Sequence, residues 1–478
     1  MFDNYIDGNW TSAEDASENR NPSDTDDLIG RFARGTAADV DRAVAASRAA
    51  LPSWSRSTPQ ARRDVLAAAA AEIASRREEL GRILSREEGK TLAEGIAEAH
   101  RAAQVMDFFA GEALRIGGES IPSVRPGVGV EVTREAVGVV GLVTPWNFPI
   151  AIPAWKLAPA LAWGNTVLLK PAELAPHSAW ALVDILNRAG LPAGVLNLVM
   201  GRGSTVGQAI VEHGGIDAVS FTGSVETGRG IARACVGGAT MKKVQFEMGG
   251  KNPFVVLDDA DLDVAVDCAL NGAFFSTGQR CTASSRLIVQ RGIHDRFVDA
   301  LTERMAALRI GDALDEATQV GPVVDASQLD QNRRYLDIGR DEGATLHAGG
   351  EVEQQARTGF FIRPALFVGA RNDMRIAREE IFGPVAAVIE VDGYDDAVAV
   401  ANDTDFGLSA GIATTSLRHA TAFKRDSEAG MVMVNLPTAG VDYHVPFGGR
   451  KGSSYGPREQ GSYAREFYTV VKTAYTSA

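Results

Sequence analysis

The fold class follows from residues 137–169, which read VGVVGLVTPWNFPIAIPAWKLAPALAWGNTVLL. Residues 137–143 and 166–169 are short β-branched runs that predict buried strands, and the apolar stretch at 150–163 between them is long enough for a helix. The alternation continues, with strands predicted over Val195–Val199 and Ala218–Phe221 and helices over His177–Arg188 and Ser204–Glu212. Strands that alternate with helices form a parallel sheet covered by helices, so the sequence predicts a Rossmann-like unit in an α/β fold.

The pattern on either side of this unit predicts how the rest of the chain is organised. Residues 37–111 have apolar side chains at helical spacing, which indicates helices packed on the unit. After Gly249 the alternation restarts, with strands predicted over Phe254–Leu257 and Leu287–Val289 and helices over Leu262–Phe275 and His294–Leu308. We therefore expect one α/β domain from residues 1–117 and 137–248, and a second from residues 249–448.

Two stretches outside these domains have strand character, Val128–Thr133 and Tyr468–Tyr475. Strands of this kind can pair across subunits or form a hairpin within one chain, and the sequence leaves both arrangements open. We assign residues 118–136 and 466–478 to a small oligomerisation element, and we expect a homo-oligomer, either a dimer or a tetramer.

The amino-acid composition narrows the range of molecules that this protein could bind. The 478 residues carry a formal charge of -13, whereas a nucleic-acid surface needs clustered Lys and Arg, so no nucleic acid is expected. The first ten residues hold two acids and no apolar core, which does not fit a secretory signal. The apolar stretches are too short or too interrupted, as by Lys156, to span a bilayer. A cytoplasmic protein without a membrane partner is expected.

The three cysteines predict one reactive thiol. Their spacing contains no CxxC pair, so neither a disulfide framework nor a metal site is expected. Cys235 and Cys268 lie among apolar residues with helical character, where a free cysteine is usually a small core side chain. Cys281 lies instead in STGQRCTASS (276–285), a small, polar and turn-prone stretch that would present a thiol.

Two further motifs supply the groups that a thiol nucleophile needs. A thiolate that attacks a carbonyl creates an oxyanion that needs a donor, and the thioester formed later needs a base to activate water. An acid, Glu247, lies in FEMGGKNP (246–253), and an amide, Asn147, lies in TPWNFP (144–149). We expect both side chains, like Cys281, to lie in turns after or between predicted elements.

Together these motifs closely resemble those of the aldehyde dehydrogenase superfamily, and the resemblance runs from YIDGNW (5–10) to the C-terminal strand. It implies an NAD(P)-dependent oxidation of an aldehyde to a carboxylic acid. Cys281 would be the nucleophile, Glu247 the base that activates the deacylating water, and Asn147 an oxyanion donor alongside the Cys281 backbone N–H. Since a CoA-acylating relative would not need Glu247, the reaction is expected to be CoA-independent.

The resemblance also makes the first domain the cofactor-binding domain and the second the catalytic domain. FTGSVETG (221–228) reads as a strand, a turn and a helix start, which would place Gly223, Ser224 and Gly228 at the pyrophosphate. GRGSTVG (201–207) lacks the third glycine of a GxGxxG motif, and its Gly203 and Gly207 would lie beside the adenosine.

Further cofactor residues follow from the same resemblance. Lys170 and Glu173 in KPAE would hold the adenosine ribose, although a capped helix start is the simpler interpretation of that motif. A carboxylate at Glu173 opposes a 2'-phosphate, so NAD is favoured and NADP stays possible. Cofactor contacts are also expected from Trp146, Glu380 and Phe382, the last two on the nicotinamide side.

The substrate is the least determined part of the prediction. Phe148, Trp155 and Phe447 match positions that line the aldehyde tunnel of the family, although an aromatic in a helix, such as Trp155, is more often a core residue. Arg280 could hold the carboxylate of a short semialdehyde, or it could be structural. The motif PFGGRKGSSYGPREQG (446–461) resembles that of the α-ketoglutarate semialdehyde (2,5-dioxovalerate) dehydrogenases, with Ser454 where Gly is common.

Several alternatives stay open at this point. Succinate semialdehyde and aromatic aldehydes such as benzaldehyde or vanillin are other possible substrates. From another class of function, the chain could be a catalytically silent nucleotide-binding structural protein. A protein of that kind would be expected to lose the Cys, Glu or Asn named above, and all three are present.

Overall fold

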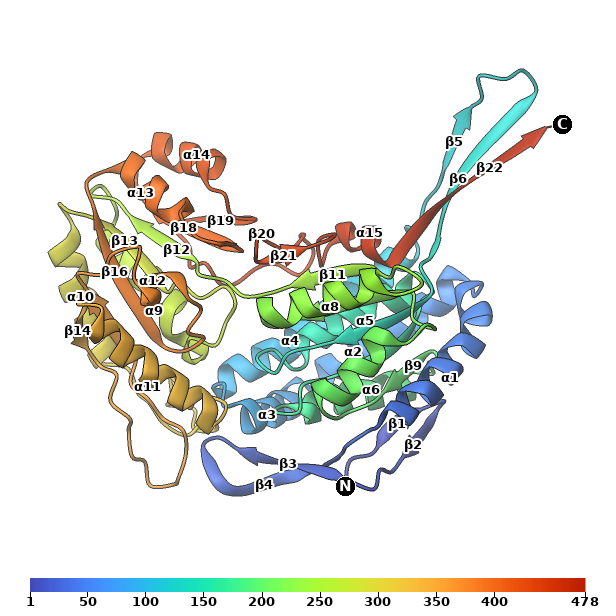
Figure 1. The fold of residues 1–478 in the computed structure, drawn as a ribbon, viewed down its shortest axis with the longest axis horizontal. Coiled ribbons are helices and arrows are strands. Elements are labelled where there is room, and N and C mark those ends of the chain that lie inside the picture. Colours follow the sequence, from blue (N-terminus) through green and yellow to red (C-terminus); the bar gives the residue numbers. More distant parts are fainter. Residues whose placement is uncertain (478) are drawn as a thin grey trace.

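The structure, a computed structural model, describes residues 1–477 and contains two large sheets with their helices and a narrow projecting arm (Figure 1). The first sheet has eight strands in the order β2-β1-β9-β8-β7-β10-β11-β21, and the five from β9 to β11 in this order are parallel. Its strands are β1 (Asn4–Ile6), β2 (Asn9–Thr11), β7 (Val139–Val143), β8 (Thr166–Lys170), β9 (Leu196–Leu198), β10 (Ala218–Thr222), β11 (Lys243–Glu247) and β21 (Ser454–Tyr455).

Helices cover both faces of this sheet because side chains alternate along each strand. Val140 and Leu142 pack on one face against α2 to α6, whereas Val139 and Leu168 pack on the other against α1, α7 and α8. These helices are α1 (Ala37–Ser55), α2 (Pro59–Ser75), α3 (Arg77–Glu88), α4 (Leu92–Ala113), α5 (Ala151–Ala162), α6 (Pro176–Arg188), α7 (Gln208–Glu212) and α8 (Val225–Gly237).

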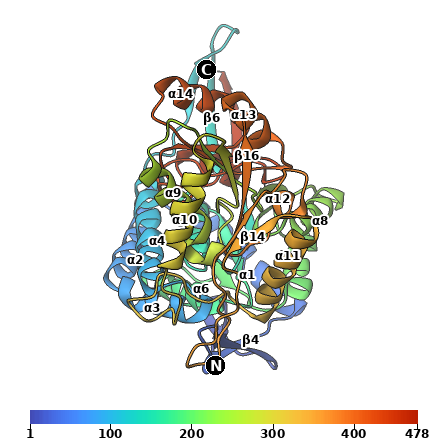
Figure 2. The ribbon, with the colours of Figure 1, turned by 90° about the vertical axis from the view of Figure 1, so that its left-hand side faces the viewer.

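The second sheet has seven strands in the order β14-β15-β16-β13-β12-β18-β19, and all neighbours except β14 and β15 are parallel. Its strands are β12 (Pro253–Val256), β13 (Arg286–Gln290), β14 (Thr345–Ala348), β15 (Ala365–Val368), β16 (Val385–Val391), β18 (Ser409–Ala413) and β19 (Met431–Val434). Figure 2 shows helices on both sides of it. They are α9 (Leu262–Phe274), α10 (His294–Ala306), α11 (Ala326–Asp341), α12 (Arg375–Arg378), α13 (Tyr394–Asn402) and α14 (Leu417–Asp426).

Three strands form the arm that stands away from the body in Figure 1: β5 (Glu119–Pro122), β6 (Val128–Ala136) and β22 (Thr469–Ser477). β22 pairs antiparallel with β6 from Thr469 opposite Ala136 to Ser477 opposite Val128, so these strands pair within one chain. The side chains of β22 beyond Thr469 are exposed. Smaller elements complete the described chain: β3 (Ala16–Asn21), β4 (Asp24–Ala33), β17 (Phe406–Gly407), β20 (Arg450–Lys451), η3 (Ser462–Ala464) and α15 (Arg465–Tyr468).

The α/β fold with a Rossmann-like sheet, predicted from residues 137–169, is confirmed. One predicted helix differs in form, because Gly203–Gly207 makes a π-helical turn, η1, and only Gln208–Glu212 is α-helical. The sequence did not predict β11, whose KVQFE has no extended β-branched run, or the four N-terminal strands. Within residues 1–477, no helix is both long enough and apolar enough to cross a membrane.

Candidate active site

The loop that carries Cys281 joins the second sheet to α9 and is fixed by an unusual backbone. Gly278 is the last of three consecutive residues with positive φ. A side chain could not be added there, because a Cβ would lie 2.2 Å from the carbonyl oxygen of Gly383. On the other side, Asn252 Nδ2 donates to the carbonyl oxygens of Cys281 at 2.8 Å and Ala283 at 2.9 Å. The loop of Cys281, the predicted nucleophile, is therefore held from both ends.

The surroundings of Cys281 act strongly on its thiol. Burial raises the pKa of Cys281 well above its ordinary value, and the nearby carboxylates of Glu380 and Glu247 raise it further. Both effects favour the protonated thiol, so a thiolate at this position would need a base nearby. Cys235 and Cys268 lie in the hydrophobic cores, where burial raises the pKa of each to about 11.

Asn147 lies in the loop between β7 and α5, as predicted, and faces the nucleophile loop. Its Nδ2 donates to the carbonyl oxygen of Gln279, two residues before Cys281, at 3.0 Å. The exposed fraction of Asn147 is 4%, so this amide lies in a site largely closed to water.

A buried ion pair holds the Asn147 loop in place. Lys90 Nζ donates to the carbonyl oxygen of Asn147 at 2.7 Å and to Glu98 at 2.6 Å, and it lies 3.9 Å from the ring centroid of Phe148. The other oxygen of Glu98 accepts from the backbone N–H groups of Ile150 at 3.2 Å and Ala151 at 3.1 Å, at the start of α5. Sequence reasoning missed both Lys90 and Glu98.

Glu247 is the last residue of β11 and not a turn residue, which corrects its expected position. Its carboxylate accepts a short hydrogen bond from Ser454 Oγ, and Ser454 Oγ accepts from the backbone N–H of Gly449 at 2.6 Å. Burial raises the pKa of Glu247 well above its ordinary value and the Glu459 carboxylate raises it further, while the Ser454 hydrogen bond lowers it. Glu247 is therefore a buried carboxylate that gains protons readily.

A second buried ion pair lies behind Glu247. Lys156 in α5 pairs with Glu459 and donates to Ser220 Oγ at 2.7 Å, and both charged side chains are almost fully buried. In the sequence, Lys156 is noticeable only because it interrupts an apolar stretch. That interruption was the one sequence signal of the ion pair between Lys156 and Glu459. Burying a lysine without a partner would be costly, so the pattern itself called for an acid nearby.

The predicted pyrophosphate motif has the expected form at the N-terminus of α8. Ser224 is the N-cap and accepts from the backbone N–H of Thr227 at 3.3 Å. Gly228 leaves no room for a side chain, because a Cβ there would lie 2.4 Å from Met248 Sδ, and Gly223 is similarly closed by the ring of Phe221. A helix N-terminus of this kind suits the phosphates of a dinucleotide.

The predicted adenosine side gathers at the end of β8. Lys170 is its last residue, and burial lowers its pKa to about 8. A Cβ on Gly207 would lie 3.9 Å from Lys170 Cδ, and Gly203 faces open space, so η1 borders the lysine without filling the region beside it. Glu173 pairs with Arg34 at 3.5 Å between Oε1 and Nε, a contact that the sequence did not predict.

The predicted nicotinamide side lies between the two sheets. Glu380 Oε1 accepts from the backbone N–H of Gly250 at 2.8 Å, and burial raises the pKa of Glu380 to about 7. Phe382 has a positive φ of 60°, and its ring meets that of Trp146 edge-on with centroids 5.4 Å apart. Of these three predicted residues, Glu380 is close enough to Cys281 to raise the pKa of its thiol, and Phe382 and Trp146 pack on each other.

Two of the three predicted tunnel aromatics pack on each other, while Phe148 lies against Lys90. The rings of Trp155 and Phe447 have centroids 5.4 Å apart, and Phe447 belongs to the small apolar cluster that contacts Cys281. Arg280 is placed differently. Its Nε donates to the carbonyl oxygen of Phe275 at 3.0 Å and its Nη2 to that of Asn271 at 2.9 Å, so the guanidinium caps the C-terminal end of α9.

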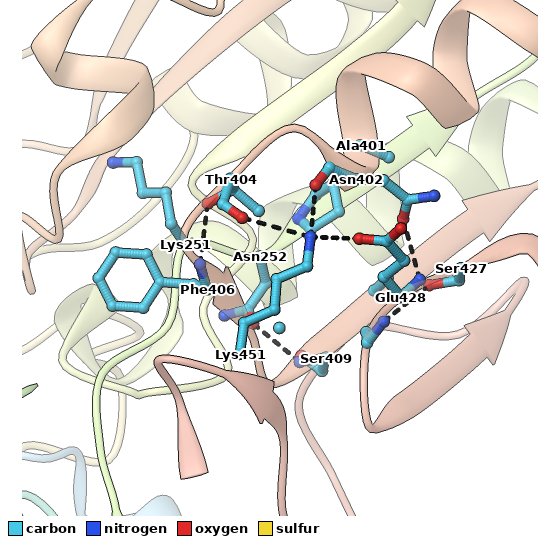
Figure 3. A pocket seen from close by; sticks show the side chains of 14 residues that line it. Lys251, Asn252, Ala401, Asn402, Thr404, Phe406, Ser409, Ser427, Glu428 and Lys451 are labelled. Atoms are coloured by element: carbon cyan, nitrogen blue, oxygen red, sulfur yellow. Dashed lines mark hydrogen bonds and ion pairs between the residues drawn. The ribbon is translucent and has the colours of Figure 1, made fainter.

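A small cavity of about 10 Å³, shown in Figure 3, is lined in part by Asn252, Ser409 and Lys451. Lys451 contacts the carbonyl oxygens of Asn402 and Thr404 and pairs with Glu428. On the same wall, Asn252 Oδ1 accepts from the backbone N–H of Ser409 at 3.0 Å. Because this volume has room for no more than about one water molecule, the cavity is too small for a substrate.

A half-buried cysteine lies between a Rossmann-like sheet and a second, largely parallel sheet, and this arrangement fits the class of nucleotide-dependent oxidoreductases that use a cysteine. Within that class the assignment is specific: residues 10–474 match the Aldehyde dehydrogenase family, and the chain belongs to this family. The resemblance noted in the sequence is thereby confirmed.

Individual relatives show how broad the match is. The chain is 44% identical to an alpha-ketoglutaric semialdehyde dehydrogenase of Bacillus subtilis, over 99% of this chain and 97% of that protein. It is also 44% identical to an alpha-ketoglutarate semialdehyde dehydrogenase of Haloferax volcanii, over 99% and 98%. Among solved structures, betaine aldehyde dehydrogenase of Staphylococcus aureus in complex with NAD+ superposes with a TM-score of 0.97 at 35% identity, covering 100% of this chain and 95% of that one.

Proposed function

We propose that this protein oxidises α-ketoglutarate semialdehyde to α-ketoglutarate, with NAD as the hydride acceptor and a thioester on Cys281 as the intermediate. One observation carries the proposal: the charges of Glu247 and Glu380 act on the thiol of Cys281, while the amide of Asn147 is bonded into the same loop. A half-buried nucleophile would thus share one site with a buried base and a buried oxyanion donor. The two semialdehyde dehydrogenases at 44% identity support the choice of substrate.

The first half of the reaction uses the nucleophile loop. After the thiol loses its proton, the sulfur of Cys281 attacks the aldehyde carbon, and the carbonyl oxygen takes up the negative charge. The Asn147 amide and the backbone N–H of Cys281 donate to that oxygen. Bound NAD would supply the hydride acceptor for this carbon, and loss of the hydride from the carbon would leave a thioester on Cys281.

The second half releases the acid. Glu247 accepts a proton from water as the water oxygen attacks the thioester carbon, and collapse of the adduct expels the sulfur of Cys281. The raised pKa of Glu247 suits this work, because a carboxylate with an ordinary pKa would be a weak base at neutral pH. We propose that Glu459 and Lys156, which lie behind Glu247, carry the proton away from the site.

The residues on the first sheet fit a dinucleotide. Gly223, Ser224 and Gly228 would hold the pyrophosphate at the start of α8, and Lys170 with Glu173 would hold the adenosine ribose beside Gly203 and Gly207. Glu380, Phe382 and Trp146 would hold the nicotinamide end next to Cys281. We propose that residues 1–117 with 137–248 form the cofactor-binding domain, and residues 249–448 the catalytic domain.

We also propose a cytoplasmic homo-oligomer, a dimer or a tetramer, in which the arm of residues 118–136 and 466–478 contacts another copy of the chain. The exposed fractions of Val471 and Tyr475 are 58% and 62%, which is high for apolar side chains, although their strand is paired with β6. Three free cysteines are consistent with a reducing compartment.

A spectrophotometric trace at the NADH absorbance tests the function. The purified enzyme should reach its highest kcat/KM with α-ketoglutarate semialdehyde, ahead of succinate semialdehyde, betaine aldehyde, benzaldehyde and vanillin, and should prefer NAD to NADP. Failure to reduce either cofactor with every aldehyde would favour a silent nucleotide-binding protein. A clear preference for an aromatic aldehyde would contradict the substrate and leave the dehydrogenase assignment intact.

The hydrogen bond from Ser454 to Glu247 gives a prediction about pH. Glu247 works as a base when deprotonated, so a rate limited by thioester hydrolysis rises with pH through the pKa of Glu247. Ser454 lowers that pKa, and Ser454→Ala should therefore raise it. We expect the acidic limb of the kcat profile to move to higher pH, because a hydrogen bond that stabilises the charged carboxylate is lost. Ser462→Ala, at an exposed serine nearby, should leave the limb in place, and an unmoved limb in Ser454→Ala would argue against Glu247 as the base.

A further inference from the structure

One face of α4 carries three charged side chains, and each of them contacts a segment near the active site. Glu94, Glu98 and Arg101 are spaced at i, i+4 and i+7, which places them on the same side of a helix. Glu94 Oε1 accepts from the backbone N–H of Ser276 at 2.8 Å and from its Oγ at 2.9 Å, in the turn that leads to Cys281. Glu98 holds the Asn147 loop, as described above. Arg101 is the next residue along this face.

Arg101 contacts the segment that borders the tunnel aromatics. Its Nη2 donates to Gln460 Oε1 at 3.2 Å, and its guanidinium carbon lies 5.8 Å from the ring centroid of Tyr443. Gln460 follows Glu459, whose backbone carbonyl accepts from the N–H of Phe447 at 2.7 Å. The guanidinium therefore lies beside the polypeptide that positions Phe447, and Phe447 in turn belongs to the apolar cluster around Cys281.

The protein compensates the positive charge of Arg101 only weakly. Within residues 1–477, no carboxylate oxygen lies within 4.0 Å of its guanidinium, although Asp442 is near enough to act on it electrostatically. Burial is the main effect and lowers the pKa of Arg101, while Asp442 raises it. A guanidinium has five N–H donors, and protein acceptors take few of those of Arg101. A half-buried arginine with spare donors is suited to a carboxylate ligand.

Arg280 lacks this freedom. Its Nε and Nη2 already donate to two backbone carbonyl oxygens at the end of α9, and these bonds turn the guanidinium toward the helix. That Arg280 binds the carboxylate stays a prediction from sequence, but its contacts favour the structural alternative.

We infer that Arg101 binds the carboxylate of the semialdehyde at the end of the substrate remote from Cys281, with Tyr443 and Gln460 flanking the guanidinium. This inference rests on the proposed function and specifies how the enzyme selects an acidic aldehyde. An aldehyde without a distal anion gains nothing from Arg101, so the residue determines specificity and takes no part in bond making.

The test compares acidic and neutral aldehydes of matched length. Arg101→Gln should lower kcat/KM for α-ketoglutarate semialdehyde and succinate semialdehyde by about tenfold to a hundredfold, mainly through KM, because a charge-assisted hydrogen bond is lost. Pentanal and butanal should change by less than about threefold. Arg101→Lys, which keeps the charge but not the planar fork, should recover part of the loss for the acids alone. Arg82→Gln, at an exposed arginine of α3, is the matched control.

The possible results distinguish a failure of the proposed function from a failure of the inference about Arg101. If the unsubstituted enzyme oxidises none of these aldehydes, the proposed function fails before Arg101 is tested. If it oxidises them, and Arg101→Gln slows acidic and neutral aldehydes equally, the inference is overturned and Arg101 is structural. A selective loss for the acids in Arg280→Gln, with none in Arg101→Gln, would likewise overturn it. Should Arg101→Gln fail to fold, Arg101→Lys decides: equal effects on acids and alkanals contradict the inference.

Discussion

Cys281→Ala should form no detectable NADH from any aldehyde while binding NAD with unchanged affinity. Without the sulfur no covalent adduct forms, and an aldehyde or its hydrate must then give up hydride unaided. We expect kcat to fall by about a thousandfold or more, as in enzymes that lose a covalent nucleophile. The NADH absorbance measures the turnover, and titration calorimetry with NAD measures the binding.

The other two cysteines provide the controls for this experiment. Cys235→Ala and Cys268→Ala alter core positions in α8 and α9 and should retain aldehyde oxidation, at some expense in thermal stability. Iodoacetamide should inactivate the enzyme by labelling Cys281, and faster as pH rises, because burial raises the pKa of this thiol. Labelling of Cys235 or Cys268 in step with the loss of activity would refute the assignment of the nucleophile.

Glu247→Gln should separate the two halves of the reaction. The amide cannot take a proton from water, so hydride transfer can occur once and the thioester then persists on Cys281. A rapid-mixing trace should show a burst of about one NADH per site, followed by turnover slower by about a hundredfold to ten-thousandfold. Denaturing mass spectrometry of the quenched enzyme should find the acyl group on Cys281.

The contrary outcome is equally informative. If the burst disappears together with steady turnover, Glu247 acts before hydride transfer, as the base that deprotonates Cys281. The geometry leaves room for that possibility, because the Glu247 carboxylate already contributes to the raised pKa of the thiol. Glu380, which raises that pKa more strongly, would then be the next residue to change.

Much of the fold could be predicted from the sequence because its signals are local. A window of a few residues is enough to recognise the β-branched runs over 139–143 and 166–170 and the apolar helix between them. Residue motifs likewise pointed to Cys281 and Asn147, since turn-prone loops present side chains at strand ends. Strand β11 was missed because short strands without a β-branched run look like loops, and Glu247 was therefore placed in a turn.

The buried ion pairs were beyond prediction for a different reason. Lys156 and Glu459 are 303 residues apart, so no short window of sequence contains both partners. Lys90 and Glu98 are only 8 residues apart, but the loop that they hold begins at the carbonyl of Asn147, 57 residues from Lys90. Their existence follows from the cost of burying a charge, but their identity depends on the tertiary fold. The pairing of β22 with β6 was left open for a related reason, because strand character does not name its partner.

The face of α4 that carries Glu94, Glu98 and Arg101 has a consequence for laboratory evolution. The turn at Ser276, the loop at Asn147 and the segment at Gln460 are all positioned by hydrogen bonds to this one helix. A substitution that tilts the helix would therefore displace all three at once. Residues that share a network deviate from additivity, and double-mutant cycles across this face should reveal coupling energies of about 0.5 to 3 kcal/mol. Libraries that retarget the enzyme to other aldehydes should therefore show strong epistasis along this helix, and should recombine poorly when its positions are varied one at a time.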